Sequence, residues 1–226
     1  MNEITVFGIA SIFLIIINII MIVLKMRKIG FNFKNSFICD FYEFKRASIA
    51  ELLVYIVSLG AIIATYISGL IVYHNILCYL ACGLFSLAFL LNIFIVLFRA
   101  KQTNTVMVMH YIFFFLFTIS TLCVGVSGFF EKRYINAPAF PMWLWICFIV
   151  IGSVLLLGFA NPLLWKPKFV EKAEDNGLTI KIRKKVIWIS IYYWIYMLCM
   201  AVEIVLLIVS SFFMEEPEPL LLTLAF

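Results

Sequence analysis

Six stretches of this chain are apolar enough and long enough to cross a lipid bilayer, and they constrain its fold more than any other feature. Five of them contain no Asp, Glu, Lys or Arg, and the sixth contains one charged residue, Glu203. A helix needs about 20 apolar residues to cross roughly 30 Å of hydrocarbon, whereas the strands of a barrel would alternate over about 10 residues. The sequence therefore predicts transmembrane helices at Ile4–Leu24, Leu52–Tyr73, Ile76–Phe98, Thr105–Phe130, Met142–Leu164 and Val186–Met214.

The composition agrees with this interpretation and excludes a water-soluble fold. Of the 226 residues, 65% are hydrophobic and 13% are charged, and the mean hydropathy is +1.14. Soluble domains carry about 25% charged residues, so too few polar side chains are available here to cover an apolar core. We expect an all-α integral membrane protein, a six-transmembrane-helix bundle that forms a single membrane domain over residues 1–226.

Basic residues divide unevenly between the two sides of the membrane. Fifteen of the 17 Lys and Arg residues fall in the connections after the first, third and fifth expected helices, and the other two are Lys132 and Arg133. Basic residues in short loops stay in the cytoplasm. We therefore expect these three connections to be cytoplasmic and the N- and C-termini to lie on the non-cytoplasmic side, in a plasma membrane or an inner membrane.

The basic connections also predict contacts with lipid. Lys181, Arg183, Lys184 and Lys185 come directly before the last apolar stretch, where basic residues attract anionic lipid by about 1 kcal/mol each. The alternative is that these basic residues only set the orientation of the protein in the membrane. The expected partner is the bilayer, with anionic lipids on its cytoplasmic face. A second membrane protein is the alternative partner. Nothing in the sequence indicates nucleic acid.

Residues for metal, haem or covalent chemistry are missing or badly spaced. None of the six cysteines forms a Cys-x-x-Cys pair, and the two histidines, His74 and His110, fall at opposite ends of the expected helices. HExxH, GxSxG and P-loop motifs are absent from the sequence. We expect no cofactor and no metal site. A lipid-modifying enzyme is the least favoured function, because a lone acid without a histidine or a second carboxylate is a poor acid–base pair.

Polar residues recur at helical spacing inside the apolar stretches. Side chains three and four residues apart share one face of a helix, and a polar face turns away from lipid. Two interpretations stay open: hydrogen bonds between helices, worth about 0.6 kcal/mol each, or the lining of a cavity. The stripes are Trp188, Tyr192, Tyr196, Cys199, Glu203, Leu206 and Ser210 on the last helix, His110, Phe114, Phe117, Thr121 and Gly128 on the fourth, Cys78, Cys82, Ser86 and Asn92 on the third, Tyr55, Ser58, Thr65 and Gly69 on the second, and Ser11 and Asn18 on the first.

Small residues repeat every four positions on the other face of the second expected helix. They are Gly60, Ala64 and Ser68. Small residues at this spacing let two helix backbones approach closely. The sequence therefore predicts a tight seam between this face and another helix.

Glu203 is the strongest candidate functional residue. An acid in the middle of a span costs roughly 2.5–3.5 kcal/mol and usually has a function or a partner. No basic residue shares its depth, so we expect a neutral, protonated acid. The candidate residues for binding a substrate or an ion with Glu203 are its stripe neighbours Tyr196 and Cys199 and the depth-matched Tyr66, Ser68, Ser120 and Thr121.

The functional hypothesis follows from this acid and its polar surroundings. We expect a multi-pass membrane protein that binds or transports a small or amphipathic solute through a polar-lined helix bundle, with Glu203 as the ionisable group. Under the alternative, Glu203 is a neutral packing group, and the protein is a non-catalytic accessory or structural subunit of a larger membrane complex.

Overall fold

A computed structural model gives the structure of the protein, and it describes residues 3–29, 33–34, 36–37, 49–97, 103–130, 141–165, 170–175, 178–183 and 187–212. Five of its helices are long and apolar enough to cross a membrane: α3 (Ile49–Ile71), α4 (Ile76–Leu97), α5 (Thr103–Ser127), α6 (Met142–Phe159) and α8 (Trp188–Phe212). A sixth helix, α1 (Glu3–Ile29), contains a shorter apolar stretch, Val6–Met21. The protein is thus a multi-span helical integral membrane protein.

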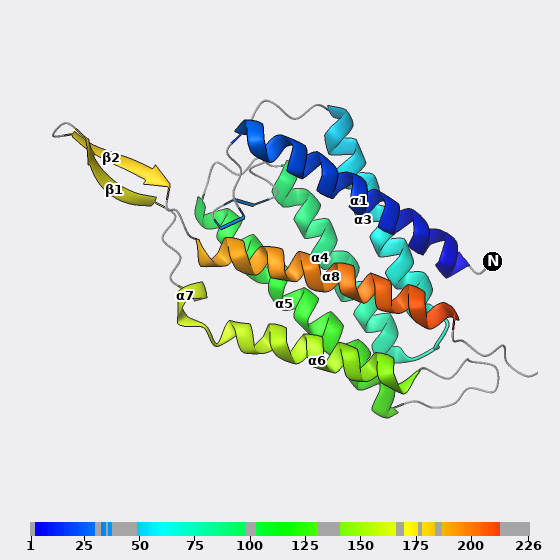
Figure 1. Cartoon of the computed structure of the whole chain (residues 1–226). Helices are drawn as coiled ribbons and strands as arrows, with labels where there is room; N and C mark the ends of the chain where they lie inside the picture. Colours follow the sequence, from blue (N-terminus) through cyan, green and yellow to red (C-terminus); the bar gives the residue numbers. More distant parts are fainter. Residues whose placement is uncertain are drawn as a thin grey trace, which may run out of the picture.

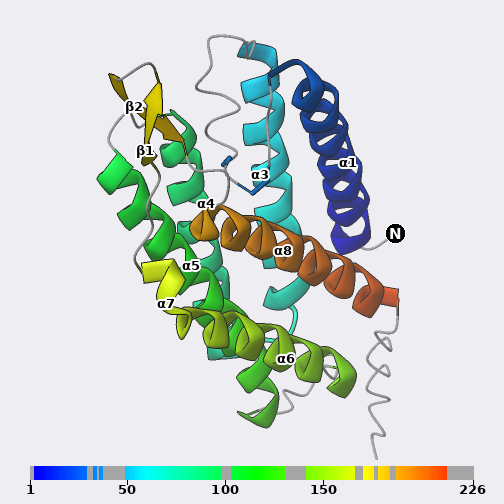
Figure 2. The same cartoon turned by 60° about the vertical axis from the view of Figure 1, so that its left-hand side comes forward.

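The helices run in alternating directions through one bundle (Figures 1 and 2). α4 packs along α5, α5 packs along α6, and α1 packs along α3. α8 contacts α1, α3, α5 and α6, so the last helix joins the two sides of the bundle. We call the end where α1 ends and α8 begins the hairpin end, because the strands β1 and β2 extend from it (Figure 1).

The turn between α3 and α4 falls where the sequence places it. His74 has a φ of 48°, in the left-handed region. The Oδ1 atom of Asn75 accepts a hydrogen bond from the backbone N–H of Leu77 at 2.9 Å, so Asn75 caps the start of α4. Its Nδ2 atom donates to the carbonyl oxygen of Ser127 at 3.1 Å, which ties this turn to the end of α5.

The helix expected at Met142–Leu164 is shorter than predicted. α6 ends at Phe159, and a separate turn, α7, covers Pro162–Trp165. Pro162 has no backbone N–H to continue the ladder of α6. The Asn161 side chain then caps α7 by accepting a hydrogen bond from the N–H of Leu163 at 3.0 Å.

A β-hairpin is the main departure from the expected all-α fold. β1 (Val170–Asp175) pairs with β2 (Leu178–Arg183) in antiparallel register, with Lys172 opposite Lys181 and Val170 opposite Arg183. The sequence does carry the signal for it. Residues 178–183 alternate between apolar and polar types, and Asn176-Gly177 stands between the two strands, a pair typical of two-residue hairpin turns.

The predicted seam of small residues on α3 is wrong at Gly60. Gly60 is exposed, and a Cβ atom placed on it would meet nothing within 4 Å. A close approach to a helix backbone lies instead between α5 and α6, where a Cβ on Gly125 would lie 2.8 Å from the backbone nitrogen of Ile149. α3 meets α1 through the other face, the one that carries Ser58 and Thr65.

Candidate functional site

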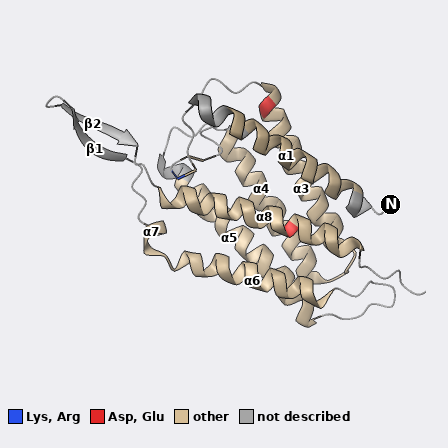
Figure 3. Cartoon of the chain, in the orientation of Figure 1, with Lys and Arg blue, Asp and Glu red and all other residues tan. Residues whose placement is uncertain are grey.

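Glu203 lies in the middle of α8 and is fully buried. The structure describes the side chains of three charged residues, Lys34, Glu51 and Glu203, and only Glu203 among them is buried. Figure 3 shows one acidic position on α8, within an uncharged part of the bundle, and Glu203 is the acidic residue of that helix. Among the described residues, no group of three His, Cys, Asp or Glu could hold a metal ion.

One hydrogen bond joins Glu203 to α5. The Oε1 atom of Glu203 lies 2.7 Å from Oγ1 of Thr121, which also lies 3.0 Å from the carbonyl oxygen of Phe117. A hydroxyl has one hydrogen and cannot donate to both acceptors. If the acid is protonated, it donates to Thr121, and Thr121 donates to Phe117, so both contacts are satisfied. The neutral acid that the sequence predicts is compatible with both contacts.

The other oxygen of Glu203 has no hydrogen-bond partner in the part of the chain that the structure describes. This oxygen, Oε2, is buried. A buried ionised carboxylate oxygen without a partner would be costly, whereas the carbonyl oxygen of a neutral acid costs less. This observation also supports the protonated form.

Of the remaining candidate residues, Tyr66, Ser120 and Tyr196 take part in two further hydrogen bonds between helices. Cys199 and Ser68 take part in neither. Tyr66 is fully buried, and its hydroxyl lies 3.1 Å from Oγ of Ser120, which donates to the carbonyl oxygen of Ala81 at 2.8 Å. The Tyr196 hydroxyl lies 2.5 Å from Oγ1 of Thr118 on α5. Cys199 and Ser68 are half-buried, and the Ser68 hydroxyl donates to its own helix at Thr65.

Aromatic side chains fill the space around these contacts. Phe113, Phe114 and Phe117 of α5 are buried and pack against Tyr196 with ring centroids 6.1, 4.5 and 5.5 Å away. Tyr66 stacks on Phe85 at 3.7 Å. These rings form a packed, aromatic core between α5 and α8, and Tyr196 lies about two turns along α8 from Glu203.

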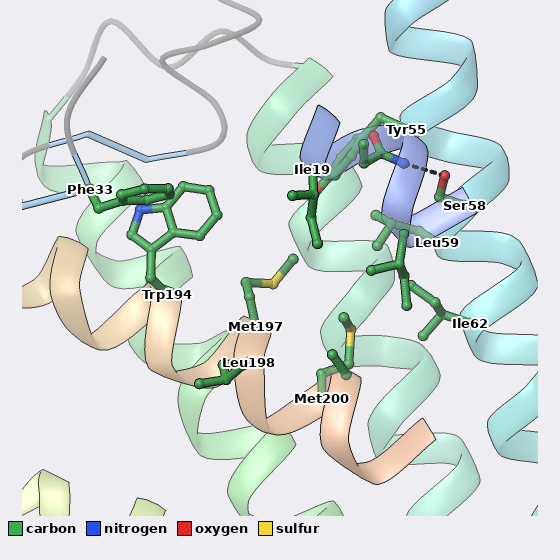
Figure 4. A pocket seen from close by; sticks show the side chains of 13 residues that line it. Ile19, Phe33, Tyr55, Ser58, Leu59, Ile62, Trp194, Met197, Leu198 and Met200 are labelled. Atoms are coloured by element: carbon green, nitrogen blue, oxygen red, sulfur yellow. Dashed lines mark hydrogen bonds between the residues drawn. The ribbon is translucent and has the colours of Figure 1, made fainter. Parts of the chain in front are cut away.

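A cavity of about 350 Å³ lies elsewhere, between α1, α3 and α8 (Figure 4). Trp194 and Ala201 of α8 point toward it, and at 3.6 residues per turn Glu203 lies on the opposite face of that helix. The lining is mostly apolar and carries no charged residue: Ile15, Asn18 and Ile19 from α1, Phe33, Tyr55, Ser58, Leu59 and Ile62 from α3 and the segment before it, and Trp194, Met197, Leu198, Met200 and Ala201 from α8.

The polar corner of the cavity belongs to the contact between α1 and α3. Nδ2 of Asn18 donates to Oγ of Ser58 at 2.5 Å, and Oγ of Ser11 lies 2.7 Å from Oγ1 of Thr65. The two bonds are seven residues apart on each helix, which is about two turns. They confirm that polar residues at helical spacing join helices here, as the stripes on the first two expected helices suggest.

At the hairpin end of the cavity, Phe33 and Ser36 contact α8. The Trp194 indole N–H and the Ser190 hydroxyl both donate to the carbonyl oxygen of Ser36, at 2.9 and 2.7 Å. Phe33 packs edge-on against Trp194 with ring centroids 5.0 Å apart. Sequence reasoning missed these contacts, because nothing in the pattern of residues 33–37 shows that they fold back onto α8.

Asn92 of α4 joins three helices, and the sequence pattern alone does not show this. Its side chain bonds to the hydroxyls of Tyr55 and Tyr193, at 3.2 and 3.3 Å, so it joins α4 to α3 and α8. The stripe on the third expected helix includes Asn92, but Tyr193 falls outside the stripe on the last helix.

No family model, curated protein or solved structure matches the chain.

Proposed function

We propose that the protein binds a small amphipathic molecule inside the membrane, in the cavity between α1, α3 and α8. The observation that carries the proposal is the combination of a cavity of about 350 Å³ with an apolar lining and one polar corner, at Asn18 and Ser58. Ligand pockets have volumes of about 300–1,000 Å³, with mostly apolar walls and a few placed polar groups. This site meets that description at the small end of the range.

The proposal includes the arrangement of the chain in the bilayer. In it α1 crosses the membrane as a sixth span, and both termini lie on the non-cytoplasmic side. The alternating directions of the helices support this arrangement. The helix ends on either side of each basic connection all lie at the hairpin end (Figure 1). The cavity then lies among membrane spans, and the ligand enters from the lipid phase.

Binding is the part of the solute hypothesis that the geometry supports best. Passage through the centre of the bundle would need an open path between α5 and α8, and aromatic side chains pack the space around Tyr196 there. In the proposal Glu203 is a neutral acid that bonds α8 to α5. Transport would then depend on movement of α8, with Tyr196, Cys199, Tyr66, Ser68, Ser120 and Thr121 changing their contacts around the acid.

Anionic lipid is the proposed partner of the β1–β2 hairpin. Lys181 and Arg183 are two positions apart on β2, and alternate residues of a strand share a face. Lys172 lies directly opposite Lys181 in the register, so three basic positions fall on one face of the hairpin. Basic residues near the membrane surface attract anionic lipid. Lys184 and Lys185 belong to the same proposal but lie outside the described residues.

The hairpin also supports the second candidate, an accessory subunit of a larger membrane complex. β1 and β2 pack mainly with each other, and they extend away from the helices (Figures 1 and 2). A two-stranded hairpin alone is marginally stable in water, so contact with a partner subunit would stabilise it. A second protein that co-purifies in stoichiometric amount from mild detergent would favour this candidate.

Filling the cavity tests the binding proposal. Ala201→Phe places a large side chain in the cavity, while Val202→Phe places the same side chain on the neighbouring residue, which is exposed and does not line the cavity. The full chain in nanodiscs is photolabelled with dodecanol that carries a diazirine in its chain. We expect label on α1, α3 and α8 of the wild type and of Val202→Phe, and its loss in Ala201→Phe. Equal labelling of all three proteins would overturn the proposal.

A further inference from the structure

The cavity between α1, α3 and α8 occupies the depth of one lipid leaflet. Trp194 and Ala201 line it and are the seventh and fourteenth residues of α8, so they lie about 9 and 20 Å from the start of that helix. Tyr55 and Ile62 are the seventh and fourteenth residues of α3, which begins at the same end. Half of the hydrocarbon layer is about 15 Å thick. The cavity therefore extends from near the membrane surface at the hairpin end to about the midplane.

The cavity lies at the outside of the bundle and is partly open. Three lining residues from three segments are exposed: Ile19 of α1 by 54%, Leu198 of α8 by 66% and Phe33 by 45% (Figure 4). Apolar side chains exposed on a membrane-spanning helix face the acyl chains of the lipid. A lipid chain therefore reaches the cavity from the side, between α1 and α8, without passing through the bundle.

The polar side chains of the lining make their hydrogen bonds within the protein. The Tyr55 hydroxyl and the Trp194 indole N–H donate to other residues of the chain. Asn18 donates to Ser58, which gives its own hydrogen to the carbonyl oxygen of Val54, and Oδ1 of Asn18 is buried. None of the 13 lining residues is charged. A headgroup inside this wall would lose its hydrogen bonds to water with little to replace them, so the cavity takes hydrocarbon and the headgroup stays outside.

The volume limits the hydrocarbon to one chain. The cavity of about 350 Å³ holds about a dozen groups the size of a water molecule at roughly 30 Å³ each. A methylene group is similar in size. One chain of about a dozen carbon atoms fits this space, and two such chains do not.

Basic residues gather where that chain would leave the cavity for the membrane surface. Lys25, Arg27 and Lys28 belong to the last two turns of α1. They come six to nine residues after Ile19 of the lining, which is about 9–14 Å further along the helix. Residues 25–51 carry six Lys and Arg against three Asp and Glu. Basic residues at the membrane surface attract anionic headgroups.

We infer that the cavity holds the hydrocarbon chain of an anionic, single-chain lipid from the leaflet at the hairpin end, with its headgroup beside the basic end of α1. This inference rests on the proposed function, since it names the chemical class of the amphipathic molecule bound in that cavity. The end of the chain lies near Ile62 and Ala201, and the headgroup lies beyond Trp194, at the surface.

The headgroup is tested with monododecyl phosphate and dodecyltrimethylammonium, which share a chain and differ in the sign of their charge. Each competes, at equal mole fraction in the bilayer, with the diazirine-bearing dodecanol for labelling of the full chain in phosphatidylcholine nanodiscs. We expect the phosphate to compete about fivefold to thirtyfold more strongly, the equivalent of one or two basic residues at about 1 kcal/mol each. Equal competition, or stronger competition by the ammonium compound, would overturn the inference and leave the proposed function standing. Labelling that neither compound displaces would contradict the proposed function itself.

The direction of the chain is tested with two further probes, dodecyl phosphates that carry the diazirine near the headgroup or near the end of the chain. We expect the first to label the protein near Trp194 and the second to label it near Ile62 and Ala201. The opposite order, or the same labelled residues with both probes, would overturn the inference.

Two double variants locate the headgroup at α1. Lys25→Gln with Lys28→Gln removes two basic residues from the end of α1, so we expect it to lose most of the preference for the phosphate and to keep its labelling by dodecanol. Arg99→Gln with Lys101→Gln is the control, because it removes two basic residues between α4 and α5, which do not line the cavity. The control should keep the preference. A preference that survives in the α1 variant, or that falls equally in both, would contradict the inference. If the α1 variant fails to fold, the wild-type comparison of the two headgroups still decides the matter.

Discussion

Several buried hydroxyl groups of this bundle follow one rule. Each lies within hydrogen-bonding distance of a backbone carbonyl, mostly in its own helix, and of a polar side chain on another helix. The described cases are Ser58, Thr65, Thr118, Ser120 and Thr121, which meet Asn18, Ser11, Tyr196, Tyr66 and Glu203 respectively. If the hydroxyl hydrogen goes to the carbonyl, the other side chain must be the donor. Glu203 fits this rule only as a protonated acid.

The rule predicts how the fold responds to changes at Glu203. Glu203→Gln keeps the shape and supplies an amide N–H to Thr121, so we expect the free energy of unfolding to change by less than about 0.5 kcal/mol. Thr121→Val leaves the acid without its partner and should cost about 1–3 kcal/mol. Combining Thr121→Val with Glu203→Leu removes both groups and should cost less than Thr121→Val alone. Thermal unfolding in detergent measures all three.

An ionised Glu203 would give a different result. Glu203→Gln would then lose a hydrogen bond to a charged group, and the loss would be about 1.5–3 kcal/mol. That outcome would contradict the neutral acid.

Asn92 offers a second test at the scale of single residues. Asn92→Leu removes the bonds to Tyr55 and Tyr193, so we expect a loss of about 1–3 kcal/mol in the free energy of unfolding. Ser86→Ala on the same helix is the control. The Ser86 hydroxyl donates to the carbonyl oxygen of Cys82 in its own turn, and its removal should change the stability by less than about 0.5 kcal/mol. Equal losses would show that Asn92 does not join the three helices.

At the scale of elements, the close approach of the α5 and α6 backbones at Gly125 predicts one glycine that the bundle needs. A Cβ on Gly125 would lie 2.6 Å from Cγ1 and 2.8 Å from the backbone nitrogen of Ile149, so the backbone of α6 would have to shift. We expect Gly125→Ala to lower the free energy of unfolding by about 1–3 kcal/mol. Thermal unfolding of the purified protein in detergent measures the change.

Gly60→Ala is the matched control for that variant. It adds the same methyl group where nothing lies within 4 Å, and Ala favours a helix over Gly by up to about 1 kcal/mol. The variant should be as stable as the wild type or slightly more stable. A destabilised Gly60→Ala would restore the seam that the Gly60, Ala64 and Ser68 pattern predicts.

The helices could be predicted from the sequence, and their partners only in part. Length and charge place the long helices within a few residues, because lipid permits few alternatives to a helix. Periodicity also shows which face of α8 is polar, and depth matching includes Thr121 among the candidates for Glu203. Which small residues meet another backbone could not be predicted. Gly60 and Gly125 look alike in a sequence, and only the positions of the neighbouring helices distinguish them.

At the scale of the whole molecule, the arrangement in the membrane predicts which cysteines a reagent reaches. A thiol reagent that cannot cross membranes should modify a Cys introduced after Met214 in intact cells. It should modify Cys39, in the first basic connection, only after the membrane is permeabilised, because basic connections stay in the cytoplasm. Cys39 and residues beyond Phe212 lie outside the described residues, so this is a test of the sequence-based orientation. The reverse labelling pattern would show that the protein has the opposite orientation in the membrane.

The cavity could not be predicted from the sequence. Its residues come from three helices, and in the sequence most of them are indistinguishable from apolar residues that face lipid or fill the core. The cavity exists because α1 and α8 touch near Gly8 and Ile208, where a Cβ on Gly8 would lie 2.4 Å from Cγ1 of Ile208, and leave space toward the hairpin end (Figure 4). That separation depends on the crossing of two helices almost 200 residues apart in the chain.

The same crossing determines when the protein can be completed during its synthesis. Chains emerge from the ribosome with the N-terminus first, so α1 is made first and α8 last. α1 can pair with α3 early through Ser11 and Asn18, but the residue that meets Gly8 does not exist until α8 has been translated. The nascent protein therefore leaves one side of α1 uncovered until the chain is nearly finished, and the proposed ligand site is the last part to form.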